Sequence, residues 1–158
     1  MIQVISDLLE QAHELCESGE FNQAILIYDR ILKKEPNNVS ALIDKGITLQ
    51  RLEQNQSSLE CFESALLLEP KNIDALVSIG ATLHGMMEFN TAIEYYNKAL
   101  EIEPSLPIAF AYKGLALGEL GKINDALICF KKALSLDKDY DLALISQDTA
   151  IDILKSKN

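Results

Sequence analysis

IDALVSIGATLHGMMEFNTAIEYYNKALEIEPSL, residues 73–106, decides the fold, because versions of this stretch recur before and after it at one fixed spacing. Shifting the sequence by 34 residues places glycines, prolines and aromatic residues in register. The glycines are Gly46, Gly80 and Gly114, the prolines are Pro36, Pro70 and Pro104, and the aromatic residues are Tyr28, Phe62, Tyr96 and Phe130. So many matching positions at one offset indicate an array of repeats.

Each repeat contains two stretches of about 14 residues with apolar residues at helical spacing, separated by a break. This pattern predicts a helical hairpin in every repeat. The breaks are Ser18-Gly19, Gln54-Asn55-Gln56, Met87-Glu88 and Gly121-Lys122. Between repeats, Pro followed by Asn or Ser is expected to end the second helix and to cap the next helix.

A period of about 34 residues with the skeleton L-G-x2-Y, A-x3-F and a closing Pro is that of the tetratricopeptide repeat, which this chain resembles. The matching residues of the quoted stretch are Leu76, Gly80, Leu83, Ala92, Tyr96, Ala99 and Pro104. Leu replaces the Tyr of the skeleton, and Ser58 replaces a small apolar residue. The repeats span about 5–38, 39–72, 73–106 and 107–140, followed by a capping helix at about 141–155.

The resemblance implies an all-α fold, a right-handed superhelix of four helical hairpins with a C-terminal solvating helix, in one domain over residues 1–158. In the first repeat, Asp7 and Ser18 occupy positions that hold apolar residues in later repeats, and Gln11 and Glu14 lie between them. This polar stripe is expected to face water. The tail keeps the residues that dock on the preceding repeat, Ala143, Ala150 and Leu154. Because both ends have a polar outer face, we expect the array to be complete.

The glycines inside the first helices each cost about 1 kcal/mol relative to alanine. A repeated cost of this kind must be offset by packing. We expect the missing side chain to let the two helices of a hairpin approach, opposite Ser58, Ala92 and Ala126. The aromatic residues then fill the remaining space between repeats.

The net charge of −10 argues against a nucleic-acid partner, which requires clustered Lys and Arg. The acidic residues either attract a basic partner or simply keep the outer face in water. Three widely spaced cysteines without a CxxC pair predict neither disulfides nor a zinc site. No leader or long apolar segment is evident, so we expect a cytoplasmic protein without membrane association.

Catalysis requires a nucleophile, a base or a metal set that converges in space. His13 and His84 are the only histidines and lie two repeats apart, so they do not share a metal. The run Gly114–Lys122 lacks the glycine and the Ser or Thr of a phosphate loop. We therefore predict no enzyme activity, no metal and no cofactor.

The concave surface is the remaining candidate site. In proteins that the chain resembles, the first helices line a groove that holds a peptide or a partner's helix. The corresponding residues are Leu9, His13, Ile43, Asp44, Ile47, Asp74, Val77, Ser78, Ala81, His84, Ile108, Ala111, Tyr112 and Leu115, with Ser40, Leu142 and Ile145 beside them. If these apolar side chains are exposed together, they form an interaction surface. The alternative is that adjacent helices cover them and leave only a shallow strip.

One activity known in the family is discounted. A subset of these proteins grips an acidic chaperone tail with two Asn and three basic residues on its inner wall. Two possible alignments place other residues there, either Leu9, His13, Asp44, Asp74 and Ser78 or Ile43, Ile47, Ser78, Ile108 and Tyr112. Neither set is a cationic clamp, and the two aspartates would repel a carboxylate.

The sequence therefore predicts an adaptor that binds an apolar peptide or helix with basic flanks from a partner protein. A second hypothesis is self-assembly through the C-terminal helix, which has more apolar residues than docking requires. These are Leu142, Ile145, Ile151 and Ile153. A third is a regulatory subunit of an enzyme complex.

Overall fold

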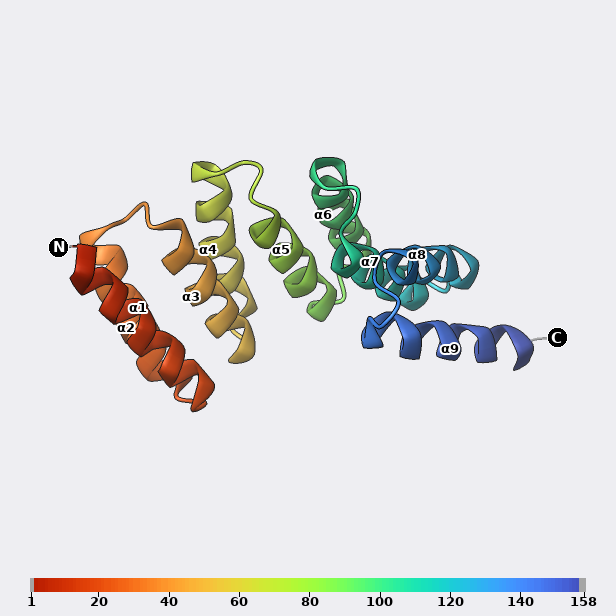
Figure 1. Cartoon of the computed structure of the whole chain (residues 1–158), viewed down its shortest axis with the longest axis horizontal. Coiled ribbons are helices and arrows are strands. Elements are labelled where there is room, and N and C mark those ends of the chain that lie inside the picture. Colours follow the sequence, from red (N-terminus) through yellow and green to blue (C-terminus); the bar gives the residue numbers. More distant parts are fainter. Residues whose placement is uncertain (1, 157–158) are drawn as a thin grey trace. The chain divides into compact units, whose positions relative to one another are not determined.

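The computed structural model describes residues 2–156, which form nine α-helices and no strand (Figure 1). The helices are α1 (Ile2–Glu17), α2 (Phe21–Lys34), α3 (Val39–Arg51), α4 (Asn55–Leu68), α5 (Ile73–Gly85), α6 (Phe89–Ile102), α7 (Pro107–Glu119), α8 (Ile123–Leu136) and α9 (Asp141–Ser156). This confirms the all-α prediction, and α9 coincides with the predicted capping helix.

The chain divides into two compact units, Met1–Ser78 and Ile79–Asn158. Unit 1 contains α1 to α4 and the first residues of α5, and unit 2 contains the last residues of α5 and α6 to α9. Within each unit, α1 and α2, α3 and α4, and α7 and α8 pack as hairpins.

The turn inside each hairpin has the same backbone conformation at the same position of the repeat. The left-handed residue of this turn is Gly19, Glu53, Met87 or Gly121. The predicted turns of the first, third and fourth repeats therefore lie where expected. In the second repeat the prediction was wrong, because Asn55 and Gln56 begin α4 and the break falls at 52–54.

Asparagine caps two of the predicted helix starts. The side-chain oxygen of Asn38 accepts a hydrogen bond from the backbone nitrogen of Ala41 at 2.9 Å, and Asn72 does the same for Ala75 at 2.9 Å. The prediction failed at α7, where Leu106 precedes the helix without a side-chain cap. Pro107 occupies the first turn there, where its missing N–H is not needed.

A glycine on the first helix and an aromatic ring on the second helix meet in three hairpins. A Cβ atom built on Gly46 would lie 2.5 Å from the Phe62 ring, and one on Gly114 would lie 2.5 Å from the Phe130 ring. Gly80 and Tyr96 make the same contact. The missing side chain thus makes room for the aromatic ring of the same hairpin. This ring is the closest neighbour of the glycine.

Ser58 fits the position of a small apolar residue because its hydroxyl has a partner. The Ser58 Oγ atom donates a hydrogen bond of 2.8 Å to the carbonyl oxygen of Gly46, and the side chain is fully buried. The bond links α3 to α4 beside the Phe62 ring. The departure from the family pattern therefore leaves no unsatisfied polar group.

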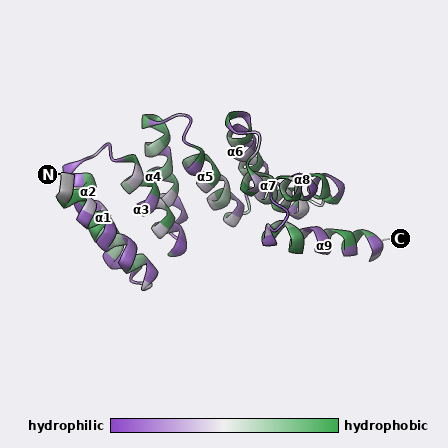
Figure 2. Ribbon diagram, in the orientation of Figure 1, coloured by the Kyte–Doolittle hydropathy of each residue, from purple (hydrophilic) through white to green (hydrophobic). Residues whose placement is uncertain are grey.

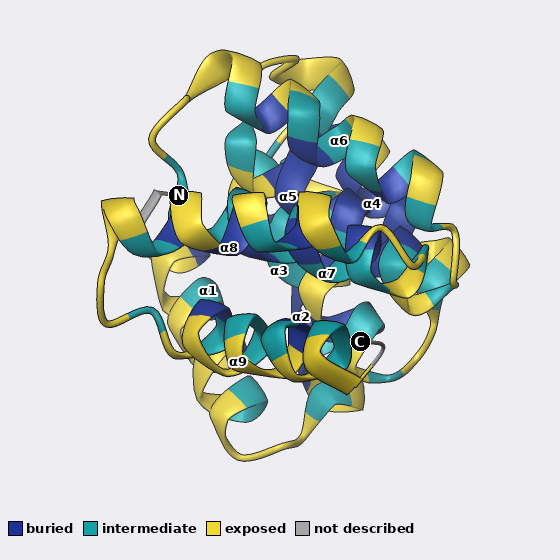
Figure 3. Cartoon of the chain, turned by 90° about the vertical axis from the view of Figure 1, so that its right-hand side faces the viewer, coloured by how far each residue is buried: buried dark blue, intermediate teal, exposed yellow. Residues whose placement is uncertain are grey.

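Each unit has its own apolar core on the faces where helices meet, with polar residues outward (Figures 2 and 3). Leu8, Tyr28 and Ile31 belong to the core of unit 1, and Phe130 and Ala143 to that of unit 2. The predicted polar residues of α1 are exposed, namely Asp7, Gln11, Glu14 and Ser18. The docking residues Ala143 and Ala150 of α9 are buried, as predicted.

We predict that Gly114→Ala destabilises the chain, because the new methyl group would overlap the Phe130 ring. Overpacking of this kind costs about 1–3 kcal/mol. Gly118→Ala on the same helix is the control, since a Cβ there has no neighbour within 4 Å. It should gain up to about 1 kcal/mol from helix propensity. Urea denaturation of both variants measures the difference, and equal stabilities would contradict the contact.

Candidate functional site

The first helices of neighbouring hairpins leave a cleft between them in unit 1. This unit 1 cleft, between α1 and α3, encloses about 260 Å³. It is lined by His13, Cys16, Glu17, Tyr28, Asp44, Ile47, Thr48 and Arg51. Most of these side chains are polar or charged, so the cleft offers hydrogen-bonding groups to a ligand.

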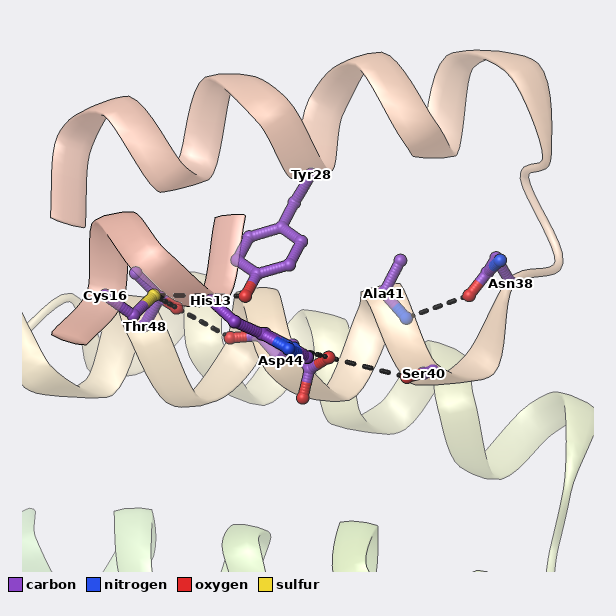
Figure 4. Close-up of polar contacts among 8 residues, drawn as sticks. All are labelled: His13, Cys16, Tyr28, Asn38, Ser40, Ala41, Asp44 and Thr48. Atoms are coloured by element: carbon purple, nitrogen blue, oxygen red, sulfur yellow. Dashed lines mark hydrogen bonds and ion pairs between the residues drawn. The ribbon is translucent and has the colours of Figure 1, made fainter. Parts of the chain in front are cut away.

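Asp44 organises the polar side of the unit 1 cleft (Figure 4). Its Oδ2 atom lies 3.0 Å from Nε2 of His13 and 3.4 Å from Oγ of Ser40, and its backbone carbonyl accepts a 2.7 Å hydrogen bond from Oγ1 of Thr48. The contact with His13 joins α3 to α1. The aspartate is therefore held in place, while the more exposed His13 remains accessible to water or to a ligand.

Tyr28 forms the floor of the same cleft. Its hydroxyl lies 3.8 Å from Sγ of Cys16, and that sulfur lies 3.4 Å from Oγ1 of Thr48 (Figure 4). Burial is the main cause that raises the pKa of the Tyr28 hydroxyl, and contact with Cys16 adds to it. A tyrosine that is neutral at any physiological pH serves here as a core residue with a polar end.

Unit 2 has a larger cleft at the corresponding place, between α7 and α9. This unit 2 cleft encloses about 400 Å³. Eight of its lining residues lie 102 positions, or three repeats, after the eight residues of the unit 1 cleft. They are Leu115, Gly118, Glu119, Phe130, Ser146, Thr149, Ala150 and Ile153. The repeat therefore produces the same cleft twice, polar in unit 1 and mainly apolar in unit 2.

One repeat before the unit 2 cleft, and also within unit 2, two aromatic side chains are in contact. The Tyr112 ring stacks on the buried Tyr96 ring, with 6.0 Å between centroids and 14° between planes. Among the described residues, neither Oη of Tyr96 nor Nε2 of His84 has a hydrogen-bond partner, although both atoms are buried. Burial is also the main cause that raises the pKa of the Tyr96 hydroxyl.

The structure separates the predicted groove residues into accessible and buried ones. His13, Ile47 and Asp74 are exposed or partly exposed. The residues of intermediate exposure are Leu9, Ile43, Asp44, Ser78, Ala81, His84, Ile108, Tyr112 and Leu115. Val77 and Ala111 are buried, so their placement on the groove surface was wrong. Ala111 packs in the core of unit 2.

Several residues that line the clefts were missed from the sequence. Cys16, Thr48 and Arg51 line the unit 1 cleft, and Gly118 and Ser146 line the unit 2 cleft. Gly118 and Ser146 stand 34 positions after His84 and Tyr112. Comparing these equivalent positions would have revealed the change from large to small side chains in the unit 2 cleft.

Within residues 2–156, no group of three or more His, Cys, Asp and Glu side chains is placed to hold a metal ion. His13 contacts Asp44, whereas the Cys16 sulfur contacts Thr48 and Tyr28. None of the helices in this part of the chain combines the length and the apolar composition needed to cross a membrane.

Comparison with protein families gives two matches. A model described as the middle TPR-like domain of cilia and flagella-associated protein 70 matches residues 8–117, and a tetratricopeptide repeat model matches residues 112–140. Together they cover most of the hairpins.

Two curated relatives match 60 residues of the chain, with 38% identity for the protein of Hordeum vulgare and 35% for that of Arabidopsis thaliana. Both are described as probable UDP-N-acetylglucosamine--peptide N-acetylglucosaminyltransferase SPINDLY. The match spans 38% of this chain but only 6% and 7% of the two relatives.

Solved structures resemble the whole chain more closely in fold than in sequence. A thermophilic TPR protein of Thermus thermophilus has a TM-score of 0.82 at 18% identity, over 93% of this chain and 82% of that chain. YrrB, described as a TPR protein with an unusual peptide-binding site, has a TM-score of 0.71 at 21% identity, over 94% and 76%. The first TPR of Spaghetti (RPAP3), bound to the HSP90 peptide SRMEEVD, has a TM-score of 0.70 at 18% identity, over 74% and 93%.

The two buried tyrosines should respond differently to loss of their hydroxyl groups. Tyr28→Phe removes a hydroxyl that contacts Cys16 and should cost about 0.5–1.5 kcal/mol, as for a typical hydrogen bond. Tyr96→Phe removes a buried hydroxyl without a partner among the described residues, so it should be neutral or stabilising. Urea denaturation of the two variants compares them. An equal loss at Tyr96 would mean that its hydroxyl has a partner such as a buried water.

Proposed function

Because the chain belongs to the tetratricopeptide repeat family, in the group described by the TPR-like middle domain of cilia and flagella-associated protein 70, we propose that it is a non-enzymatic scaffold. It binds a peptide or a helix of a partner protein against its first helices. YrrB and the RPAP3 domain, which share the fold, are described with a peptide-binding site and a bound peptide, and this supports the assignment.

The observation that favours this function is the recurrence of an open cleft between first helices. The clefts of about 260 and 400 Å³ lie at equivalent positions of the repeat, although their side chains differ in chemistry. Ile47 and Ile145 are exposed beside them, at 36% and 68%. An exposed apolar side chain next to a cleft gives a ligand surface to bury, at about 25 cal/mol per Å² before ordering costs.

The partner is expected to be apolar with basic flanks. Asp44 and Asp74 lie on the first helices of unit 1, and the whole chain has a net charge of −10. Acidic residues at the edge of an apolar surface attract Lys and Arg and set the orientation of a ligand. The same charges oppose an acidic peptide such as the HSP90 sequence that the RPAP3 domain holds.

The scaffold acts in a reducing compartment, for which we propose the cytoplasm. Cys61 and Cys129 are buried single thiols, and burial raises the pKa of both. A thiol in such surroundings is a small core residue and reacts slowly. This arrangement suits a cytoplasmic protein better than a secreted one, whose small domains usually form disulfides.

Selection of the full chain against a displayed library of random peptides tests the proposed function. We expect enrichment of peptides with apolar anchors and basic flanks. Ile47→Arg in unit 1 or Ile145→Arg in unit 2 should weaken the selected peptides at least tenfold, since arginine would place a charge in the ligand surface. Isothermal titration measures the affinities.

Leu26→Arg and Ile128→Arg provide matched controls for these variants. Leu26 on α2 and Ile128 on α8 are exposed at 63% and 65%, and neither residue lines a cleft. They should leave peptide affinity unchanged. A library without enriched peptides, or equal effects of cleft and control variants, would refute binding at the first helices.

A second candidate function is self-assembly through α9. The exposure of apolar side chains on this helix favours it. Leu144 and Ile145 are exposed on this helix at 40% and 68%. Of the apolar residues that suggested this role, Leu142 packs against the core of unit 2 instead. Ile151 and Ile153 have intermediate exposure.

Leu144→Asp separates self-assembly from peptide binding, because Leu144 does not line the unit 2 cleft. If α9 pairs with a second chain, sedimentation over a concentration series should show a dimer for the natural chain and a monomer for the variant. A natural chain that stays monomeric at every concentration would eliminate self-assembly, while peptide binding would be unaffected.

A further inference from the structure

The unit 2 cleft can be compared with the equivalent place one repeat earlier, also within unit 2. There the Tyr112 ring of α7 stacks on the Tyr96 ring of α6, with 6.0 Å between centroids and 14° between planes. The chain therefore occupies this place with its own aromatic side chain.

One repeat later, between α7 and α9, the equivalent residues are small. Ser146 stands 34 positions after Tyr112, and Gly118 stands 34 positions after His84. A Cβ atom added to Gly118 would have no neighbour within 4 Å, so the space there is open. Phe130, equivalent to Tyr96, lines the resulting cleft of about 400 Å³ without a ring from α9 beside it.

We propose that the unit 2 cleft binds an aromatic side chain of the partner, which takes the place that Tyr112 occupies one repeat earlier. The proposal rests on the proposed function and specifies the anchor residue of the bound peptide. The cleft volume lies within the range of about 300–1,000 Å³ that is usual for ligand pockets.

The chemistry of the walls suits a ring with a polar edge. Leu115, Ala150 and Ile153 offer apolar surface, and the hydroxyl of Ser146 and the carboxylate of Glu119 offer acceptors for a phenol or an indole N–H. An aromatic side chain has only two rotatable bonds, so it loses little entropy when it enters a slot between two helices. Buried aromatic anchors of this kind dominate the affinity of many interfaces.

The direct test uses isolated side-chain analogues on the full chain. Spectra of 13C-labelled alanine and isoleucine methyl groups are recorded during titration with N-acetyl-tyrosinamide, N-acetyl-phenylalaninamide or N-acetyl-leucinamide. The aromatic amides should shift the methyl signals of Ala150 and Ile153, and the leucine amide should shift them several-fold less. The methyl signal of Ala143, which is buried and does not line the cleft, serves as the internal control. Equal shifts with the leucine amide would overturn the proposal.

Ser146→Tyr closes the cleft from within, because it supplies the ring that Tyr112 supplies one repeat earlier. This variant should lose the methyl shifts while its melting temperature stays the same or rises. Ser146→Ala, which keeps the cleft open, should retain them. Persisting shifts in Ser146→Tyr would overturn the proposal, and so would its failure to fold, since the cleft would then have no room for a ring.

The peptide library distinguishes failure of this inference from failure of the proposed function. Ser146→Tyr should weaken library peptides with an aromatic anchor at least tenfold. If peptides bind and Ser146→Tyr weakens none of them, the aromatic pocket is wrong and the scaffold function stands. If the amides bind but no peptide is ever enriched, the scaffold function is wrong.

Discussion

The contact of an aromatic ring with a glycine, made inside three of the hairpins, is the constraint on which the other features depend. Phe62 rests on Gly46, Tyr96 on Gly80 and Phe130 on Gly114. Because no side chain fits between ring and helix, the contact fixes how closely the second helix approaches the first. The helices of a hairpin are thereby positioned by an interaction within the hairpin, independently of any ligand.

Because the contact between glycine and ring lies inside the hairpin, the residues of the first helices that line a cleft are free to vary. The unit 1 and unit 2 clefts occupy the same place in the repeat, yet one contains the paired His13 and Asp44 and the other contains Leu115 and Ser146. Neither set is needed for the contact between glycine and aromatic ring. Substitutions at cleft positions outside that contact can therefore change binding while the hairpins keep their stability.

The 34-residue offset was sufficient to predict the hairpins, the role of the glycines as sites of close approach and the caps at Asn38 and Asn72, because each depends on local sequence. The turn at 52–54 was missed because Asn55 resembles a turn residue, although register placed the left-handed residue at Glu53. Exposure within the groove was harder to predict. Ala111 shares the helical face of exposed residues, but contacts from neighbouring helices bury it, and periodicity alone does not include those contacts.

The different chemistry of the two clefts determines what each can select. A ligand that enters the unit 1 cleft displaces water from the hydrogen-bonded side chains of His13 and Asp44, so it must offer hydrogen-bonding groups in exchange. A ligand that enters the unit 2 cleft meets mostly apolar walls, and an unpaired polar group there would lose its own hydration without compensation. Under the proposed function, a polar side chain would therefore be disfavoured in the unit 2 cleft unless it finds a partner there, whereas the unit 1 cleft offers such partners. Specificity would then arise from rejection as much as from attraction, because an unpaired polar group costs binding free energy.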